Sequence, residues 1–548
     1  VSQLRSLNLS AARRATRSAA FEPAEEYFAR ARALADEDLW QLDYEEAFAI
    51  HVEGARSAYL NGDRETMQRL IDVAVAHARD AVDAAEAREV HIHALVSEQK
   101  FAEAVGLALD VLEELDVKLP RTPTDADVGA AVGEALELLR ANAFDAIVRR
   151  APVTSRRVIA AQRIKQGVMS AAYLTAPGLL PLLAASLVRS TLVDGVAKQS
   201  AYGFAAFGMV MNALGLIDVS YENGRTALAL LDRTQDRLTL PKTRHIVRAH
   251  LNPFVEPIGE SVEHERDVFQ LSMDNGDLEY AAWALHIMVV HAFYAGRGLE
   301  GLREMGATHR EILTRTRQLP ALGCTTPFIQ AVESCLGAAS DPTRLRGPDY
   351  DEDAHGAELE AVNFRGAAYI LTVAKTFVRF LFRDLDGALL AADAGARFAD
   401  GAVASFHPVW WHQYRSLAAL GTAKADDDLT VVHASLEQLR KWCGFSEKNH
   451  RHRVALLEAE LARVEGRDGE AVARYDEAVA AARANGFLHE EGIANELAGR
   501  YYLARGGATA ARAYLREARD AYADWGATAK VDQLNAELGH VLERAKRD

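Results

Sequence analysis

The sequence predicts an all-α protein, an α-solenoid in which TPR-like antiparallel helix pairs form a superhelix. Apolar residues recur at three- and four-residue spacing almost throughout the 548 residues, and the breaks are short and carry Gly, Asp or Asn. Alanine is frequent, and no convincing run alternates apolar and polar residues as a strand would. The helical segments also recur at a fixed period, which is the signature of repeat architectures.

The repeat is clearest near the C-terminus, in residues 454–486 and the unit that follows them. Gly466 and Gly506 lie 40 residues apart, and so do Ala478 and Ala518. This offset corresponds to the ~34-residue tetratricopeptide (TPR) repeat with a slightly longer connection. Two antiparallel helices cross closely only where side chains are small, while larger residues fill the space between neighbouring pairs. The spacing therefore predicts stacked helix pairs.

Weaker copies of this pattern predict that the array extends over the whole chain. They combine a turn with small or apolar residues seven positions apart, and they lie in residues 21–31, 100–111, 215–227 and 383–395. One such copy is expected by chance in an alanine-rich chain, but several with a preceding turn indicate a real repeat.

Two segments interrupt the helical pattern. Residues 118–127 hold two prolines before a new helix begins, and residues 338–358 are rich in Pro, Gly and Asp. We predict that the second segment is an exposed connection. It would divide an N-terminal TPR-like superhelix, residues 1–337, from a C-terminal one, residues 359–548.

Charge and cysteine content exclude several classes of protein. The chain has 62 Lys and Arg against 78 Asp and Glu, a net charge of −16, whereas a nucleic-acid partner requires clustered basic residues. Three cysteines, Cys324, Cys335 and Cys443, are too few for a disulfide framework and suit a reducing compartment. We therefore expect a cytoplasmic protein that binds no nucleic acid.

Three uncharged stretches approach the length of a membrane span, namely residues 171–188, 199–217 and 280–296. The first contains two prolines, the second contains Gln, Ser and Asn, and the third contains two histidines. No basic flank orients them consistently. We interpret all three as fully buried solenoid helices and expect no membrane span.

The motifs of common catalytic and metal sites are missing from the sequence. There is no G-x-x-x-x-G-K-[ST] phosphate loop, no G-x-G-x-x-G after a strand, no H-E-x-x-H and no G-x-S-x-G. Cys443, His450 and His452 lie close in sequence, but their spacing is no known zinc pattern and a fourth ligand is missing. We expect no catalytic residues, no metal site and no cofactor.

The best candidate for a functional surface is the aromatic segment 406–416. Trp410, Trp411, His412 and Tyr414 cluster there in a chain with only 6 tryptophans. Adjacent tryptophans cannot face the same side of a helix, so at least one points away from the core of its own helix pair. Two interpretations stay open, since these aromatics either line a groove that anchors a ligand or peptide, or pack on the neighbouring repeat.

A second candidate is a pocket in the enclosed middle of the chain, around residues 171–296. His286, His291 and Tyr294 would line it, together with Tyr280. An enzyme with its site in this region is one alternative, and histidines buried in a core with satisfied hydrogen bonds are the other.

Residues 441–534 resemble the helical region of a family of very large bacterial STAND-type signalling ATPases. In that family a serine/threonine kinase domain often comes first, followed by an AAA-like ATPase, the TPR-like region, and a GAF domain with a sensor histidine kinase or a cyclase. The matching positions, which the resemblance implies are mostly structural, include Trp442, Asn449, His452, His489, Glu490, Asn495, Glu496, Arg512, Tyr514 and Trp525.

The N-terminal part is also similar, since Trp40, Tyr44 and Tyr59 follow the pattern that comes directly after the ATPase in that family. The chain departs from the family in one respect, because kinase, ATPase and output domains are absent from it. The resemblance therefore implies a sensor or scaffold arm and carries over no enzymatic activity.

These observations predict a non-catalytic module that binds a protein, a peptide or a small-molecule inducer and regulates an ATPase or kinase linked in cis. A solenoid whose repeats contact only their neighbours can change curvature, and its long concave face can bind a partner. A stand-alone TPR adaptor that assembles other proteins is the first alternative, and the enzyme with a central pocket is the second.

Overall fold

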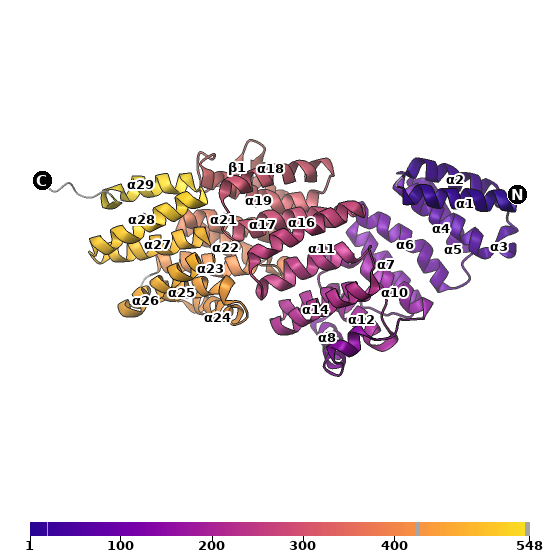
Figure 1. The fold of residues 1–548 in the computed structure, drawn as a ribbon, viewed down its shortest axis with the longest axis horizontal. Coiled ribbons are helices and arrows are strands. Elements are labelled where there is room, and N and C mark those ends of the chain that lie inside the picture. Colours follow the sequence, from indigo (N-terminus) through magenta and orange to yellow (C-terminus); the bar gives the residue numbers. More distant parts are fainter. Residues whose placement is uncertain (19, 424–427, 543–548) are drawn as a thin grey trace. The chain divides into compact units, whose positions relative to one another are not determined.

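The computed structural model describes residues 1–18, 20–423 and 428–542, and helices α1 to α29 make up most of them (Figure 1). Successive helices pack as antiparallel pairs, for example α25 on α26 and α27 on α28. The prediction of an all-α solenoid of helix pairs is confirmed. In the described ranges, strands occur only as one two-residue hairpin, β1 (Arg346–Gly347) and β2 (Tyr350–Asp351).

The chain forms two compact units, Val1–Gly203 and Phe204–Asp548, and the division falls within α13 (Ser200–Ala213). The helices of the first unit are α1 (Ser2–Arg17), α2 (Phe21–Ala33), α3 (Leu39–Leu42), α4 (Tyr44–Leu60), α5 (Arg64–Ala76), α6 (Ala81–Ser97), α7 (Phe101–Glu114), α8 (Asp125–Arg140), α9 (Phe144–Val148), α10 (Arg156–Gly167), α11 (Met169–Thr175) and α12 (Leu179–Asp194).

The second unit continues the array with longer helices. They are α14 (Ile217–Thr234), α15 (Leu240–His245), α16 (Ile258–Asp274), α17 (Leu278–Tyr294), α18 (Leu299–Arg315), α19 (Leu319–Leu336), α20 (Glu352–Ala361), α21 (Arg365–Leu381), α22 (Leu385–Ala396), α23 (His407–Thr422), α24 (Thr430–Cys443), α25 (Glu447–Val464), α26 (Asp468–Ala484), α27 (Leu488–Ala504), α28 (Ala508–Trp525) and α29 (Thr528–Leu542).

Aspartate and glycine define many of the turns between helices. The Asp63 side chain accepts a hydrogen bond from Thr66 N at 2.9 Å, and Asp80 accepts from Val82 N and Asp83 N, so both cap the start of a helix. Gly466, which follows α25, has a φ of +73°, a left-handed conformation that glycine adopts without steric cost. The breaks read from the sequence are therefore the helix ends of the structure.

The uncharged stretches are buried helices, as α12 and α17 show. In α17 every residue from Ala284 to Tyr294 is buried. Within the described residues, no helix combines the length and the apolar character that crossing a membrane requires.

The segment 338–358 differs from its prediction. It lies inside the second unit, and its last residues are the first two turns of α20, where Glu352 is fully buried. Helices before and after it, from Ile217 to Leu542, contribute to one hydrophobic core. The division between the two compact units therefore follows Gly203 and does not lie at this segment.

The second unit is held together by contacts between helices far apart in sequence. Asn449 Nδ2 donates to Pro253 O at 2.8 Å and to Glu256 O at 2.7 Å, and Trp525 Nε1 donates to Arg297 O at 3.1 Å. In a simple solenoid each repeat contacts only its neighbours in sequence. Here the last helix pairs also pack on the chain that leads into and out of α16 and α17, so the array closes on itself.

Gly296 marks a close approach within this closure. Its φ is +70°, and a Cβ there would lie 2.7 Å from His489 Nδ1 and 2.9 Å from Leu488 N. Gly466 has nearly the same φ, but a Cβ there would meet no atom of the described residues within 4 Å. A substitution at either glycine strains the backbone, but only one at Gly296 also disturbs a contact between distant segments. Comparing the two positions therefore distinguishes the two effects.

We expect Gly296→Ala to destabilise the second unit much more than Gly466→Ala. Both variants strain a left-handed residue by about 1–2 kcal/mol, and only Gly296→Ala adds an overpacking cost of about 1–3 kcal/mol. Urea denaturation followed by tryptophan fluorescence measures the difference. Equal losses of stability in the two variants would contradict the closure.

Candidate functional site

The aromatic segment begins α23, and the structure places two of its four candidate side chains, Trp410 and Tyr414, inside the core. Trp410 is fully buried and Tyr414 is 1% exposed. The Trp410 ring lies 4.3 Å from the ring of Tyr294 and 5.0 Å from that of Tyr414, measured between centroids. The groove-lining interpretation is wrong for Trp410 and Tyr414, because both side chains are enclosed in the core.

Trp411 and His412 face another side of α23, as adjacent residues on a helix must. Both are half-buried, Trp411 Nε1 donates to Ala392 O at 2.8 Å, and a hydrogen bond of 2.9 Å joins His412 Nδ1 to Ser435 Oγ. Their contacts are with α22 and α24, the neighbouring helices in sequence. Trp411 and His412 therefore pack on neighbouring repeats, as the alternative interpretation stated.

The histidines expected in a central pocket are also buried. His286 is 3% and His291 is 2% exposed. Hydrogen bonds join His286 Nδ1 to Thr325 Oγ1 at 3.1 Å and His291 Nδ1 to Ser261 Oγ at 2.7 Å, and the Tyr294 hydroxyl contacts His407 Nδ1. These residues lie in the core with hydrogen-bond partners, which agrees with the second of the two alternatives.

Burial keeps this cluster neutral. It lowers the pKa of His286 to about 3 and that of His291 well below its usual value, and neighbouring imidazoles add to the effect. Burial likewise raises the pKa of the Cys324 and Cys335 thiols. A buried thiol with a raised pKa is a poor nucleophile.

A fully enclosed ion pair of the second unit joins α25 to α27. Arg453 is fully buried, and its Nη1 lies 2.5 Å from Glu490 Oε1. Gln413 Nε2 donates to Glu490 Oε2 at 2.7 Å, and the Tyr414 hydroxyl donates to Glu490 Oε1 at 2.8 Å. Arg453 Nε also donates to Asn449 O at 3.1 Å. The network therefore connects α23, α25 and α27 to Asn449, which itself contacts Pro253.

A second buried ion pair fastens α29 to the rest of the unit. Lys530 Nζ lies 2.9 Å from Glu496 Oε2 and donates to Leu381 O at 2.6 Å, while the Tyr522 hydroxyl donates to Glu496 at 2.8 Å. Although burial opposes ionisation, Lys530 and Arg500 lower the pKa of Glu496 to about 2. The carboxylate is therefore held charged in the core.

Three of the residues that carry the family resemblance, Asn449, Glu490 and Glu496, belong to these two networks. Arg512 and Tyr514 are half-buried, where Arg512 Nε donates to Val541 O at 2.9 Å and the Tyr514 hydroxyl donates to Asp476. The buried ones are Trp442, Asn449, His452, His489, Glu490, Asn495, Glu496 and Trp525. Their burial fits the structural role that the resemblance implies.

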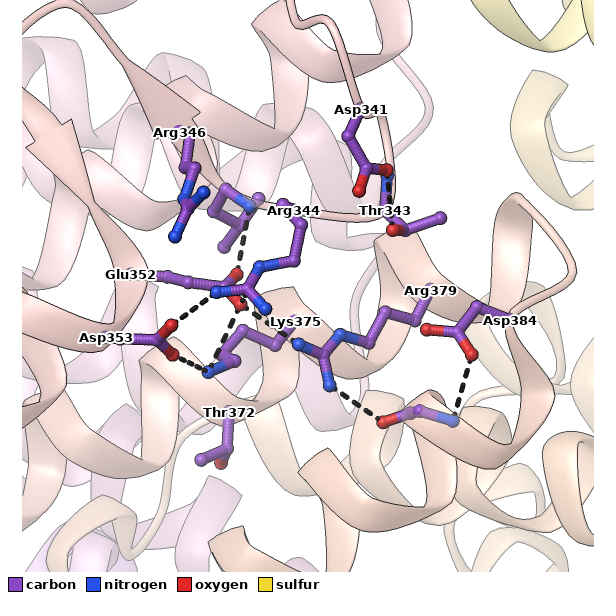
Figure 2. A network of polar contacts seen from close by, with 12 residues as sticks. Asp341, Thr343, Arg344, Arg346, Glu352, Asp353, Thr372, Lys375, Arg379 and Asp384 are labelled. Carbon is purple, nitrogen blue, oxygen red and sulfur yellow. Dashed lines mark hydrogen bonds and ion pairs between the residues drawn. The ribbon is translucent and has the colours of Figure 1, made fainter.

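Figure 2 shows a third network, which sequence reasoning missed, where the hairpin of 346–351 meets α21. Glu352 is fully buried, and its carboxylate contacts Arg344 Nε at 3.0 Å, Arg379 Nη2 at 2.9 Å and Lys375 Nζ at 3.4 Å. Leu345 N donates to the same carboxylate at 2.9 Å. Asp353, which is largely exposed, also pairs with Arg344 and Lys375.

This network attaches the segment 338–358 to α21 in the helical core. We expect Glu352→Ala to destabilise the second unit by about 3–5 kcal/mol, because three cations would lose their buried partner. Asp353→Ala removes a carboxylate that pairs with two of the same cations at the surface, and its expected cost is below about 1 kcal/mol. Urea denaturation checks both values, and similar costs for the two variants would argue against a buried anchor.

The arrangement of these networks is suited to rigidity. Within the described residues, no group of three or more His, Cys, Asp or Glu is placed to hold a metal ion. The charged side chains at the centres of the networks, Arg453, Lys530 and Glu352, are covered by protein and neutralised by partners. These buried charges therefore fix the positions of the helices relative to one another.

No protein-family profile matches the chain. A curated protein, the hybrid signal transduction histidine kinase G of Dictyostelium discoideum, is similar to it, with 23% identity over 329 residues. The match covers 54% of this chain and 10% of the kinase, so the matched region spans about a tenth of that relative's length.

Among solved structures, a circular tandem repeat protein with novel repeat topology and enhanced subunit contact surfaces aligns with the chain. The alignment covers 98% of this chain and 95% of that protein, with 12% sequence identity and a TM-score of 0.17.

Proposed function

We propose that this chain is a non-catalytic, protein-binding regulatory module of a larger signalling protein. The observation that carries the proposal is a helical-repeat array similar in part to a histidine kinase about ten times as long as the matched region. Helical repeats present extended surfaces on which partners bind. The proposal places the protein in the cytoplasm, where thiols such as Cys324, Cys335 and Cys443 stay reduced.

The finer part of the proposal is regulation of a STAND-type ATPase or kinase linked in cis. A partner or a small-molecule inducer would bind the array and shift the linked enzyme between two states, which requires different affinities for the two. The closed second unit suits this role, because the closure joins segments about 190–230 residues apart in sequence. Opening or tightening it would move both ends of the unit together.

The test uses the complete polypeptide that contains this chain. We expect its open reading frame to encode an ATPase or kinase domain, and we expect Gly296→Ala to change the rate of ATP hydrolysis or autophosphorylation. Gly466→Ala, which disturbs no long-range contact, is the matched control. An open reading frame with no such domain would leave the stand-alone adaptor as the function, and identical rates in the two variants would contradict regulation through the closure.

A further inference from the structure

A small cleft opens between α6 and α10 of the first unit. Its volume is about 180 Å³. Its apolar lining is formed by Val82, Ala85, Ile159, Ala160 and Ile164, and its charged lining by Glu86, Glu89, Arg156 and Arg163. Alanine at position 85, and again at position 160 on the facing helix, keeps the two helices from filling the space between them.

The volume of the cleft indicates what fits in it. Sites for drug-sized ligands occupy about 300–1,000 Å³, so this cleft is too small for one. A single extended side chain is an occupant of suitable size. Since aliphatic residues form much of the lining, the buried part of that side chain would be a hydrocarbon stem.

The charged residues that line the cleft indicate which head group the side chain carries. Arg156 Nη2 lies 2.6 Å from Asp83 Oδ1, and that aspartate also accepts from the Tyr44 hydroxyl. Arg163 Nε donates to Glu89 Oε1 at 3.2 Å. Both arginines that line the cleft therefore already have carboxylate partners.

Glu86 is the exception among the charged residues of the cleft. Its side chain is half-buried, and its carboxylate forms no hydrogen bond or ion pair with any residue in the part of the chain that the structure describes. An unpaired carboxylate beside an apolar lining complements a side chain with an aliphatic stem and a cationic head.

We propose that this cleft binds one Lys or Arg side chain presented by a partner protein. The aliphatic stem would lie on Val82, Ile159 and Ile164, and the ammonium or guanidinium group would donate to Glu86. The inference rests on the proposed function, because it identifies where a protein partner contacts the array and what chemistry that partner must offer.

The test uses the whole chain with isotope-labelled isoleucine methyl groups. The probes are n-butylguanidinium and n-butylammonium, which mimic the two side chains, and 1-pentanol is the neutral control of similar shape. We expect saturable shifts of the Ile159 and Ile164 methyl resonances with the cations. Glu86→Gln should weaken the binding of both cations at least tenfold.

Glu113→Gln on α7 is the matched control, because it changes the net charge equally and lies outside the cleft. It should leave the binding of the cations unchanged. Three results would overturn the inference, namely no saturable shift with either cation, equal weakening by the two variants, or equal binding of 1-pentanol. Such a failure would leave the proposed regulation standing, since that is tested by Gly296→Ala in the second unit.

Discussion

Acidification from about pH 7.5 to about pH 5.5 is expected to destabilise the second unit by at least about 4 kcal/mol. Burial lowers the pKa of His250 and His286 to about 3 and that of His412 to about 4. A histidine whose pKa is lower in the folded state than in the unfolded state binds fewer protons when folded. Its contribution to stability is therefore complete above the unfolded pKa of about 6.5 and is lost as the pH falls towards the folded pKa.

The magnitude follows from linkage. One pH unit below the unfolded pKa, each such histidine costs about 1.4 kcal/mol, so these three together cost about 4 kcal/mol. Other buried histidines with a lowered pKa add to this, among them His291 and His407, while Glu265, whose pKa burial raises, offsets part of it. A loss of this size is a large fraction of the free energy of unfolding of a typical domain, which is about 5–15 kcal/mol.

Urea denaturation at the two pH values, followed by tryptophan fluorescence, measures the effect. Five of the 6 tryptophans lie in the second unit, so the signal reports mainly on it. His412→Gln should reduce the pH dependence by about 1.4 kcal/mol, whereas His433→Gln, at an exposed position, should leave it unchanged. Equal stability at the two pH values would show that the imidazoles are accessible to protons in the folded protein.

Arg453→Met is expected to cost about 3–5 kcal/mol, because it leaves the Glu490 carboxylate buried without its cation. The pair is among the most enclosed of the unit, with side chains that are 0% and 1% exposed. Arg451→Met on the same helix removes a pair with Glu477 whose side chains are 43% and 27% exposed, and it should cost below about 1 kcal/mol.

The double variant Arg453→Met with Glu490→Gln separates the ion pair from packing. It should recover much of the lost stability, since no unpaired charge then stays buried, and the coupling appears in a double-mutant cycle. If the two single variants at positions 453 and 451 cost the same, Arg453 is not an organising residue of the core.

The sequence predicted the local architecture well, because the pairing of adjacent helices depends on residues that are close together in the sequence. Gly466, Gly506 and the alanines between them define turns and crossing points that depend only on nearby residues. The interpretation of Trp410 and Tyr414 could not be decided in the same way. Whether an aromatic residue lines a groove or a core depends on what covers it, and here the cover is chain from more than 100 residues away, such as Tyr294.

The buried charges were missed for the same reason. Arg453 and Lys530 look like ordinary surface residues of amphipathic helices, and Glu352 lies in a segment whose composition predicts an exposed connection. One signal was present, since Arg453 begins an otherwise apolar run in the middle of a helix. The partners that make such positions tolerable, Glu490 on another helix pair and Leu381 across the unit, follow from closure of the array and not from its period.

Hydrogen exchange of the intact chain tests the closure of the second unit most directly. If α16 and α17 share one cooperative unit with α27 and α28, their amides should open with the same free energy, and Gly296→Ala should lower that value equally in all four helices. Gly466→Ala should lower it less. Independent opening of the two regions, with Gly296→Ala affecting only α17, would show that the array is an open solenoid whose repeats contact only their neighbours.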